Sequence, residues 1–219
     1  MLAGLSAFYG GFSAAAAQAV AETTLEVLAA LVEHSLLRHG ADGRFQLYEL
    51  VRQFAGEKLA AAPQHEAATR EQHSRYYLAL LKSWNNAFVE GPRATPAPAA
   101  SEDIVNIHAA WNWAGARCDI AAIEQALEPL ANFYQNCGRY QQGQIDLAST
   151  AAHLATSDRF AAHIERRRIY AQLLGRQGLF CYLLGDYDAA SSYLEQACRR
   201  HKRRRSRMRK PLRSLCLAR

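Results

Sequence analysis

The chain has 219 residues, half of them hydrophobic, and a formal net charge of +6. This length can bury a real core and holds one or two domains of ordinary size. The positive charge is confined to one end, because residues 199–219 contain eleven Lys and Arg and no Asp or Glu, which leaves −5 on residues 1–198. The net positive charge therefore belongs to the tail. It does not indicate that the rest of the chain binds nucleic acid.

The cysteines and the N-terminus bear on the cellular compartment. Five cysteines never approach a C-x-x-C spacing, so we expect free, mostly buried thiols and neither disulfides nor a metal site: Cys118, Cys137, Cys181, Cys198 and Cys216. The apolar N-terminus lacks the basic start of a secretory leader, since no Lys or Arg precedes Arg38, and Gly10-Gly11 interrupts it. The prediction is a cytoplasmic protein without a membrane segment.

Residues 1–62 have the element order of a winged helix. Ser13 and Thr23 are typical helix N-caps, and Thr23 with Glu26 has the spacing of a capping box. They predict two short helices, at about 13–22 and 24–35. Two β-prone pieces follow around Ala41-Asp42-Gly43, a turn typical of hairpins, and a helix is expected from about 48 to 61.

The next segments predict a connecting helix and a linker. Residues 63–89 form a long helix in this prediction, with a wide stripe of aromatic and aliphatic residues at helical spacing that we interpret as core: His73, Tyr76, Tyr77, Leu80, Leu81, Trp84 and Phe88. Residues 90–100 hold three of the six prolines and predict an extended linker.

Residues 101–200 predict paired helices with an internal repeat. Two segments align at an offset of 47 residues and share a G-x-Y turn, a small residue five positions after the glycine and a leucine four positions later. This is the pattern of a tetratricopeptide unit, in which small residues let helices approach closely. The residues expected to pack the repeats are Gly138, Tyr140, Gly143, Leu147, Gly178, Gly185, Tyr187, Ala190, Leu194 and Ala197.

The repeat array and the tail carry further expectations. Stacked repeats normally need three or more units to close their core, and the sequence contains about two. We therefore expect a marginally stable array that self-associates through its uncovered last helix. Residues 201–219 are strongly basic and are predicted to be disordered.

Several stretches together resemble one family: "LSAFYGGFSAAAAQAV", "LAALVEHSLLRHGADGRFQLYELVRQFAGEKLA", "HSRYYLALL", "IVNIHAAWNWA" and "LLGDYDAASSYLEQA". In wording and order they are similar to the region that follows the nucleotide-binding core in bacterial STAND ATPases, notably LuxR-type transcriptional regulators. The resemblance covers about residues 1–200. It implies a mainly α fold, in which a winged helix with a small β-hairpin precedes a tetratricopeptide superhelix that serves as sensor or partner-binding arm.

The chain departs from this family at the nucleotide site. It contains no G-x-x-x-x-G-K-[ST] loop, so no cofactor is expected in this chain, and ATP or ADP is expected only on a missing upstream P-loop module. The tail also matches nothing expected of the family, which favours a truncated or frame-shifted end.

A second departure lies at the hairpin-to-helix junction. The family has a phosphate-contacting His there and this chain has Tyr48, so Tyr48, Glu49 and Arg52 are candidates for a degenerate nucleotide-sensing site. The alternative is a folding corner, with the Tyr48 ring packed on the hairpin and the two charged side chains near solvent.

The functional prediction is a non-catalytic regulatory and protein-interaction fragment for signal transduction and transcription regulation. Its partner is expected to be another protein or the missing ATPase module. No catalytic constellation and no metal-ligand spacing are recognisable in the sequence. The alternative is a nucleic-acid binder that uses the wing and the tail, although the second helix offers Glu26 and Glu33 and no base-reading side chain. The candidate contacts are Arg38, Arg44, Arg203, Arg204 and Arg205.

Overall fold

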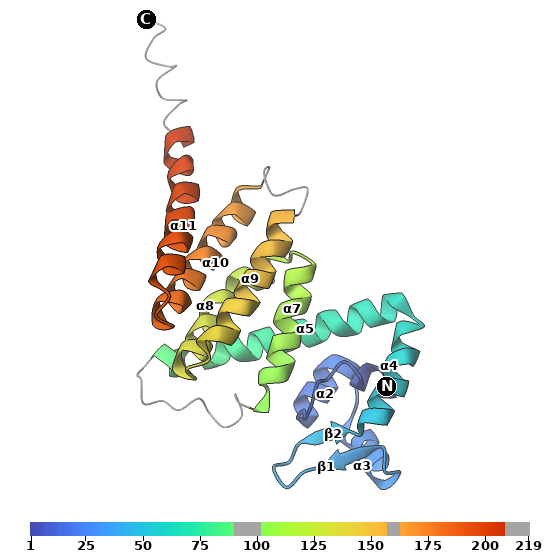
Figure 1. The fold of residues 1–219 in the computed structure, drawn as a ribbon. Coiled ribbons are helices and arrows are strands. Elements are labelled where there is room, and N and C mark those ends of the chain that lie inside the picture. The colour runs from blue at the N-terminus through green and yellow to red at the C-terminus, as the bar shows by residue number, and fades with distance from the viewer. Residues whose placement is uncertain (90–101, 157–162, 209–219) are drawn as a thin grey trace, which may run out of the picture. The chain divides into compact units, whose positions relative to one another are not determined.

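The computed structural model describes residues 1–89, 102–156 and 163–208. The described chain is mainly helical, with a small two-stranded antiparallel sheet (Figure 1). It divides into two compact units, Met1–Ala114 (unit 1) and Gly115–Arg219 (unit 2). The predicted linker at residues 90–100 lies outside the described residues.

Unit 1 holds short helices, one hairpin and two longer helices. In chain order its elements are α1 (Leu2–Leu5), α2 (Ala14–Ala21), α3 (Leu25–Glu33), β1 (Leu37–His39), β2 (Phe45–Leu47), α4 (Glu49–Ala60), α5 (Pro63–Val89) and most of α7 (Ile104–Ala116).

One of the two predicted helix caps is confirmed and the other is wrong. The Ser13 hydroxyl accepts a hydrogen bond from the Ala16 N–H at 3.1 Å and caps α2. The N-cap of α3 is Thr24, whereas the buried Thr23 donates its hydroxyl proton to the Ala21 carbonyl at 3.1 Å. Thr23 and Glu26 therefore form no capping box, because this hydroxyl satisfies the end of α2 and not the start of α3.

The predicted hairpin is confirmed, and a third segment joins it. Gly43 takes a positive φ of 77° in the turn, which the Asp-Gly pair predicts. On the other side of β2, Phe12 and Phe45 exchange backbone hydrogen bonds of 2.9 and 2.8 Å as an isolated antiparallel bridge. The segment before α2 is thereby held on the sheet.

Aromatic side chains fill the core of unit 1. Phe8 stacks on Phe12 with ring centroids 4.3 Å apart and meets the edge of Tyr77, and all three side chains are buried. His73, Tyr77 and Leu81 lie on the buried face of α5, which confirms the core interpretation for the middle of its stripe. The other members of the stripe whose burial is described, Tyr76, Leu80 and Trp84, are half-buried.

Helix α7 belongs to unit 1 up to Ala114, whereas the sequence groups residues 101–114 with the repeats. It lies against α5, where the Ser74 hydroxyl donates to the Ala110 carbonyl at 2.9 Å. Helix α7 also makes polar contacts with the N-terminal segment of unit 1, and these contacts explain why it is grouped with that unit. Helical periodicity in the sequence gives no information about such contacts.

Unit 2 consists of paired helices, α8 (Ile120–Asn136), α9 (Tyr140–Thr156), α10 (Ile164–Leu183) and α11 (Tyr187–Met208). Helix α10 packs against α8, α9 and α11. Helix α11 runs to Met208 and so includes the first eight residues of the basic segment 201–219. Lys and Arg are good helix formers, which explains why the helix runs into the basic segment.

The lengths and hydropathies of the described helices bear on membrane insertion. None of these helices alone is long and apolar enough to cross a bilayer, and α2 with α3 meets the criterion only as a pair bent by 107°.

Candidate functional sites

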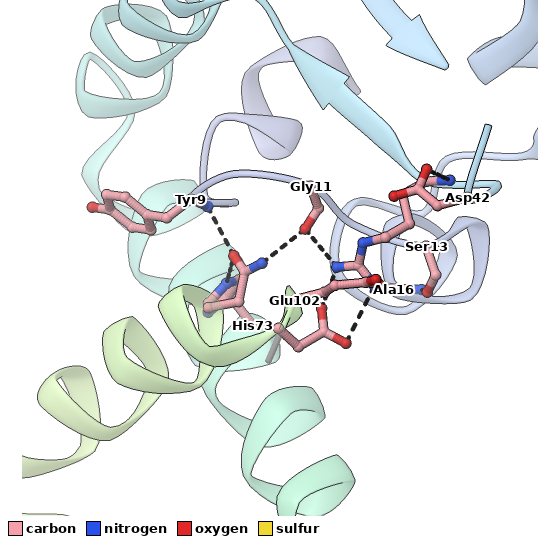
Figure 2. A network of polar contacts seen from close by, with 10 residues as sticks. Tyr9, Gly11, Ser13, Ala16, Asp42, His73 and Glu102 are labelled. Carbon is pink, nitrogen blue, oxygen red and sulfur yellow. Dashed lines mark hydrogen bonds and ion pairs between the residues drawn. The ribbon is translucent and has the colours of Figure 1, made fainter. Parts of the chain in front are cut away.

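A buried polar network joins the turn of the hairpin to the start of α7 in unit 1 (Figure 2). The Arg44 guanidinium forms an ion pair with Asp103 and donates a hydrogen bond to the Gly11 carbonyl at 2.8 Å. Glu102 lies 3.7 Å from the same guanidinium. The side chains of Arg44 and Asp103 are only 12% and 9% exposed, so the pair is largely shielded from water.

Asn106 extends the network toward α5. Its Oδ1 accepts the Tyr9 N–H at 2.8 Å, its amide donates to the Gly11 carbonyl at 3.0 Å, and its Oδ1 lies 3.3 Å from His73 Nε2 (Figure 2). Burial lowers the pKa of His73 to about 4, and the Arg70 charge acts in the same direction. His73 is therefore neutral at pH 7 and serves as a hydrogen-bond partner of Asn106.

The contacts of this polar network support a structural role for its residues. Arg44, Asp103 and Asn106 hold the loop before α2, the hairpin and α7 in one arrangement, and each has its polar groups engaged inside the unit. Burial also raises the pKa of Tyr77, so its phenol stays protonated. Within the described ranges, no three His, Cys, Asp or Glu side chains come together in a way that could hold a metal ion.

The network also bears on the predicted nucleic-acid contacts. Arg44 does not present its guanidinium to solvent, as a phosphate contact requires. Arg38 is exposed and donates to Gln46 at 2.6 Å across the hairpin. Residues 203–205 belong to α11 in unit 2. Arg38 is thus the predicted hairpin contact that remains open to solvent.

The predicted nucleotide-sensing residues lie at the start of α4. Tyr48 is the N-cap residue, and 48% of its surface is exposed. Arg52 donates to both Glu49 carboxylate oxygens, at 2.9 and 2.7 Å, and lies 5.4 Å from the centre of the Tyr9 ring. Hydrogen bonds from Arg52 and then Gln53 lower the pKa of Glu49 to about 2. Glu49 and Arg52 thus neutralise each other's charge, and the neighbouring Tyr48 remains open to solvent.

Helix α4 also exposes apolar residues that the sequence analysis did not single out. Leu50 and Phe54 lie one turn apart on its exposed face, and the Lys58 ammonium lies 5.2 Å from the centre of the Phe54 ring. The i, i+4 spacing of Leu50 and Phe54 was the available signal, but the same spacing is typical of a buried stripe. Only the structure distinguishes these two cases.

The first helix pair of unit 2 is closely packed at its predicted positions. Gly138 ends α8 with a positive φ of 65°. A Cβ at Gly143 would lie 2.6 Å from the Phe180 ring and 3.0 Å from the Tyr134 ring, so only glycine fits without movement of an aromatic side chain. Leu147 is fully buried. Gly143 and Leu147 are therefore packed against neighbouring side chains, whereas Gly138 serves the turn.

The second pair uses the corresponding positions, but part of its surface is open. Gly185 has a positive φ of 84°, and a Cβ at Gly178 would lie 2.9 Å from the Leu194 side chain. Ala190 is buried and Ala197 is half-buried. Tyr187 and Leu194, in contrast, are 66% and 46% exposed.

Comparison of the chain with protein-family models, with curated proteins and with solved structures finds no match. The family resemblance accordingly rests on the sequence, and the fold and the sites rest on the geometry described above.

Proposed function

We propose that this chain is a non-catalytic regulatory and protein-interaction region of the STAND ATPase type, with a winged-helix module in unit 1 and a tetratricopeptide-like arm in unit 2. The observation that carries the proposal is that one chain combines the element order of a winged helix with the element order of a helical repeat. Each is supported by contacts that the sequence pattern alone does not contain.

The winged-helix proposal is supported by the Phe12 bridge. A winged helix needs a short strand between its first two helices, paired with the hairpin that follows the third helix. Phe12 lies between α1 and α2 and exchanges two backbone hydrogen bonds with Phe45 of β2. The order helix, bridge, helix, helix and hairpin therefore fits this module.

The repeat proposal is supported by backbone conformation. Gly138 and Gly185 take the left-handed conformation at the same point of each pair, 47 residues apart, where α8 turns into α9 and α10 into α11. Glycine is the residue that adopts this conformation without a steric penalty. Two turns of the same type, followed by small residues at the same position, fit a stacked helical repeat.

A protein partner fits the surface of unit 1 better than nucleic acid does. The exposed side chains of α3 include Leu25, Glu26 and Glu33, a combination that repels phosphate and supplies no donor for base edges. Arg44 is engaged with Asp103, and the exposed face of α4 carries Leu50 and Phe54. An apolar surface with acidic neighbours is suited to another protein.

The proposal is tested with a P-loop ATPase module of this regulator class supplied in trans. We expect the full chain to associate with the module in sedimentation and to change its ATPase rate. The double variant Leu50→Ser/Phe54→Ser should weaken this association at least tenfold, because these side chains are the exposed apolar anchors of α4. Ile145→Ser, which changes an exposed isoleucine on α9, is the matched control. No association and no change in rate would contradict the proposal.

The alternative function is nucleic-acid binding through the basic end of the chain. It is favoured by the eleven Lys and Arg of residues 199–219, of which the first ten residues belong to α11. Binding to duplex DNA that falls steeply with salt and disappears on deletion of residues 199–219 would support it. Binding that survives the deletion and is lost in Arg38→Ala would implicate the hairpin.

A further inference from the structure

An exposed apolar patch lies where α10 turns into α11. We call it the turn patch, and it consists of Tyr182, Leu183, Leu184, Tyr187 and Leu194. All five side chains are exposed, although they are large and apolar or aromatic. The Tyr182 and Tyr187 rings are 5.6 Å apart in an edge-to-face arrangement, which joins the two sides of the turn into one surface. Apolar surface gathered in one place marks an interaction site.

The first helix pair shows what covers two of these positions. Tyr140 and Leu147 of α9 stand 47 residues before Tyr187 and Leu194 of α11. Helix α10 packs on α9, with the Phe180 ring 6.3 Å from the Tyr140 ring, and Leu147 is fully buried. Leu194 is 46% exposed, because no helix among the described residues covers α11 in this way. The α11 surface is therefore one on which a helix like α10 fits.

The packing of α10 on α9 also gives the direction of a helix placed on α11. The two helices are antiparallel, because Phe180 near the end of α10 lies against Tyr140 at the start of α9. The Gln144 amide donates to Cys181 Sγ at 3.1 Å, and Gln144 corresponds to Ser191 of α11. A helix placed on α11 in the same way has its C-terminal turn beside the start of α11.

The charges around the turn patch indicate the chemistry of that helix. Residues 182–195 contain three exposed acids, Asp186, Asp188 and Glu195, and no Lys or Arg. Glu195 is paired with Arg199. The two aspartates lie at the start of α11, where they repel the phosphates of nucleic acid and of anionic lipid. A complementary helix carries Lys or Arg in its C-terminal turn, the end at which the helix dipole also favours cations.

The turn of the first pair has neither the apolar nor the acidic character of the second. The positions of Tyr182 and Leu183 are polar there, and their counterparts Gln135 and Asn136 are exposed even though α10 covers α9. The first aspartate of α11 corresponds to Arg139. These positions face solvent within the stack, so the lack of a neighbouring helix does not explain the change. A second protein that contacts the turn does explain it.

We propose that the turn patch is the docking site for an amphipathic helix of another protein. The apolar face of this helix covers two anchors, Tyr187 and Leu194, and its C-terminal turn presents Lys or Arg to the two aspartates. A second copy of α11 is a poorer fit, because antiparallel pairing of these anchors sets Glu195 of one copy opposite Asp186 of the other, and like charges repel. The inference deepens the proposed protein-interaction function, on which it rests, by naming the class of partner.

A stapled peptide based on α10 is the probe. It has the sequence of residues 164–183, which carries the apolar face that covers α9, followed by two lysines. A staple replaces Glu165 and Gln172, both exposed in α10, so that the peptide is helical before it binds. Fluorescence anisotropy of the labelled peptide, titrated with the full chain, measures the dissociation constant. A reductant prevents disulfides through the exposed Cys198.

The first comparison tests the place of binding. We expect saturable binding whose dissociation constant rises at least tenfold in Tyr187→Ser/Leu194→Ser. The Ile145→Ser control should leave it unchanged, because Ile145 is exposed on α9 outside the patch. Circular dichroism verifies that each variant keeps its helices. A peptide that merely exchanges with the chain's own α10 binds α9 instead, so it would be insensitive to the double variant and would overturn the inference.

The second comparison tests the charge of the partner. Replacing the two lysines of the peptide by glutamates should weaken binding at least fivefold. In the Asp188→Lys chain the preference should reverse, so that the glutamate peptide binds more tightly than the lysine peptide. Asp186 is left unchanged, because it caps α11 by accepting the Ala189 N–H at 3.0 Å. Equal affinities of both peptides for both chains would overturn the basic partner.

The outcomes separate this inference from the proposed function. No saturable binding of the peptide overturns the docking helix. If the peptide does not bind and sedimentation shows a dimer that Tyr187→Ser/Leu194→Ser weakens, the occupant is a second copy and the inference is wrong. If the chain still associates with the ATPase module in either case, the proposed function stands and only the docking helix is wrong.

Discussion

The two units are stabilised in different ways. Unit 1 is held by contacts between residues far apart in the sequence, such as Arg44 with Asp103 and Tyr9 with Asn106, around a core of aromatic rings. Unit 2 is held by packing between neighbouring helices, with close contacts at Gly143 and Gly178. Substitutions in unit 1 should therefore act through buried polar partners, and those in unit 2 through helix spacing.

The comparison can be tested separately in each unit. Trp84, Trp111 and Trp113 are the three tryptophans of the chain, and all precede residue 115. Tryptophan fluorescence therefore follows the unfolding of unit 1, whereas far-UV circular dichroism follows the helices of both units.

The largest effect is expected at the buried ion pair of unit 1. Arg44→Met leaves the Asp103 carboxylate buried without its partner and should lower the free energy of unfolding by about 3 kcal/mol. Urea titration followed by tryptophan fluorescence measures this loss. The double variant Arg44→Met/Asp103→Leu should recover most of it, because no unpaired charge remains.

An exposed pair of the same unit provides the control. Arg75 lies 3.0 Å from Glu71 on α5 with most of its side chain in solvent, so Arg75→Met should cost less than about 0.5 kcal/mol. Equal losses in Arg44→Met and Arg75→Met would mean that the network does not stabilise unit 1.

The next effect compares two glycines of unit 2. Gly143→Leu forces a side chain between the buried rings of Phe180 and Tyr134 and should cost about 2–3 kcal/mol. Gly178→Leu meets the half-exposed Leu194, which can move, and should cost about 1–2 kcal/mol. Urea unfolding followed by circular dichroism gives both values. If Gly178→Leu has the same free energy of unfolding as the original chain, the proposed alignment of the two repeats is wrong.

The pH dependence of unit 1 should show a smaller effect. The pKa of His73 is about 4 in the folded chain and 6.5 as the ordinary value, so the unfolded chain binds more protons between these limits. The stabilisation is complete above pH 6.5 and is lost as the pH falls toward 4. The loss between pH 7 and pH 5 should be about 2 kcal/mol.

His73→Gln isolates this contribution, because its amide can still donate to Asn106 and does not titrate. Fluorescence-detected urea unfolding at pH 7 and pH 5 should show a weaker pH dependence in the variant. The same pH dependence in both chains would mean that another group is responsible.

Much of the local structure could be predicted from the sequence, because caps, turns and periodicity act over a few residues. The Ser13 cap, the positive φ of Gly43 and the helix expected at 63–89 are confirmed. Thr23 is wrong as a cap because two adjacent threonines offer the same chemistry, and only the tertiary fold selects Thr24.

The candidate sites were less predictable. Arg44 and Asp103 are separated by 59 residues, and no local pattern indicates that a hairpin arginine turns inward to a helix start. The exposure of Tyr187 and Leu194 likewise depends on whether another helix covers them, although their sequence positions match the buried Leu147 and the half-buried Tyr140. Sequence patterns specify which faces are apolar, but the partner of each face is a property of the assembled structure.

The smallest expected effect concerns the junction at Tyr48, which is open to solvent in unit 1. A phenol is neutral near pH 7 and cannot supply the charge of an imidazolium to a phosphate, and Arg52 is already paired with Glu49. Adding ATP or ADP should therefore leave the melting temperature unchanged in the chain and in Tyr48→His, because one added imidazole does not replace the backbone amides and lysine of a P-loop. Differential scanning fluorimetry over a range of nucleotide concentrations measures this. A nucleotide-dependent rise in the original chain that is abolished by Tyr48→Ala would instead make the junction a working site, and unit 1 would then carry binding chemistry as well as a structural network.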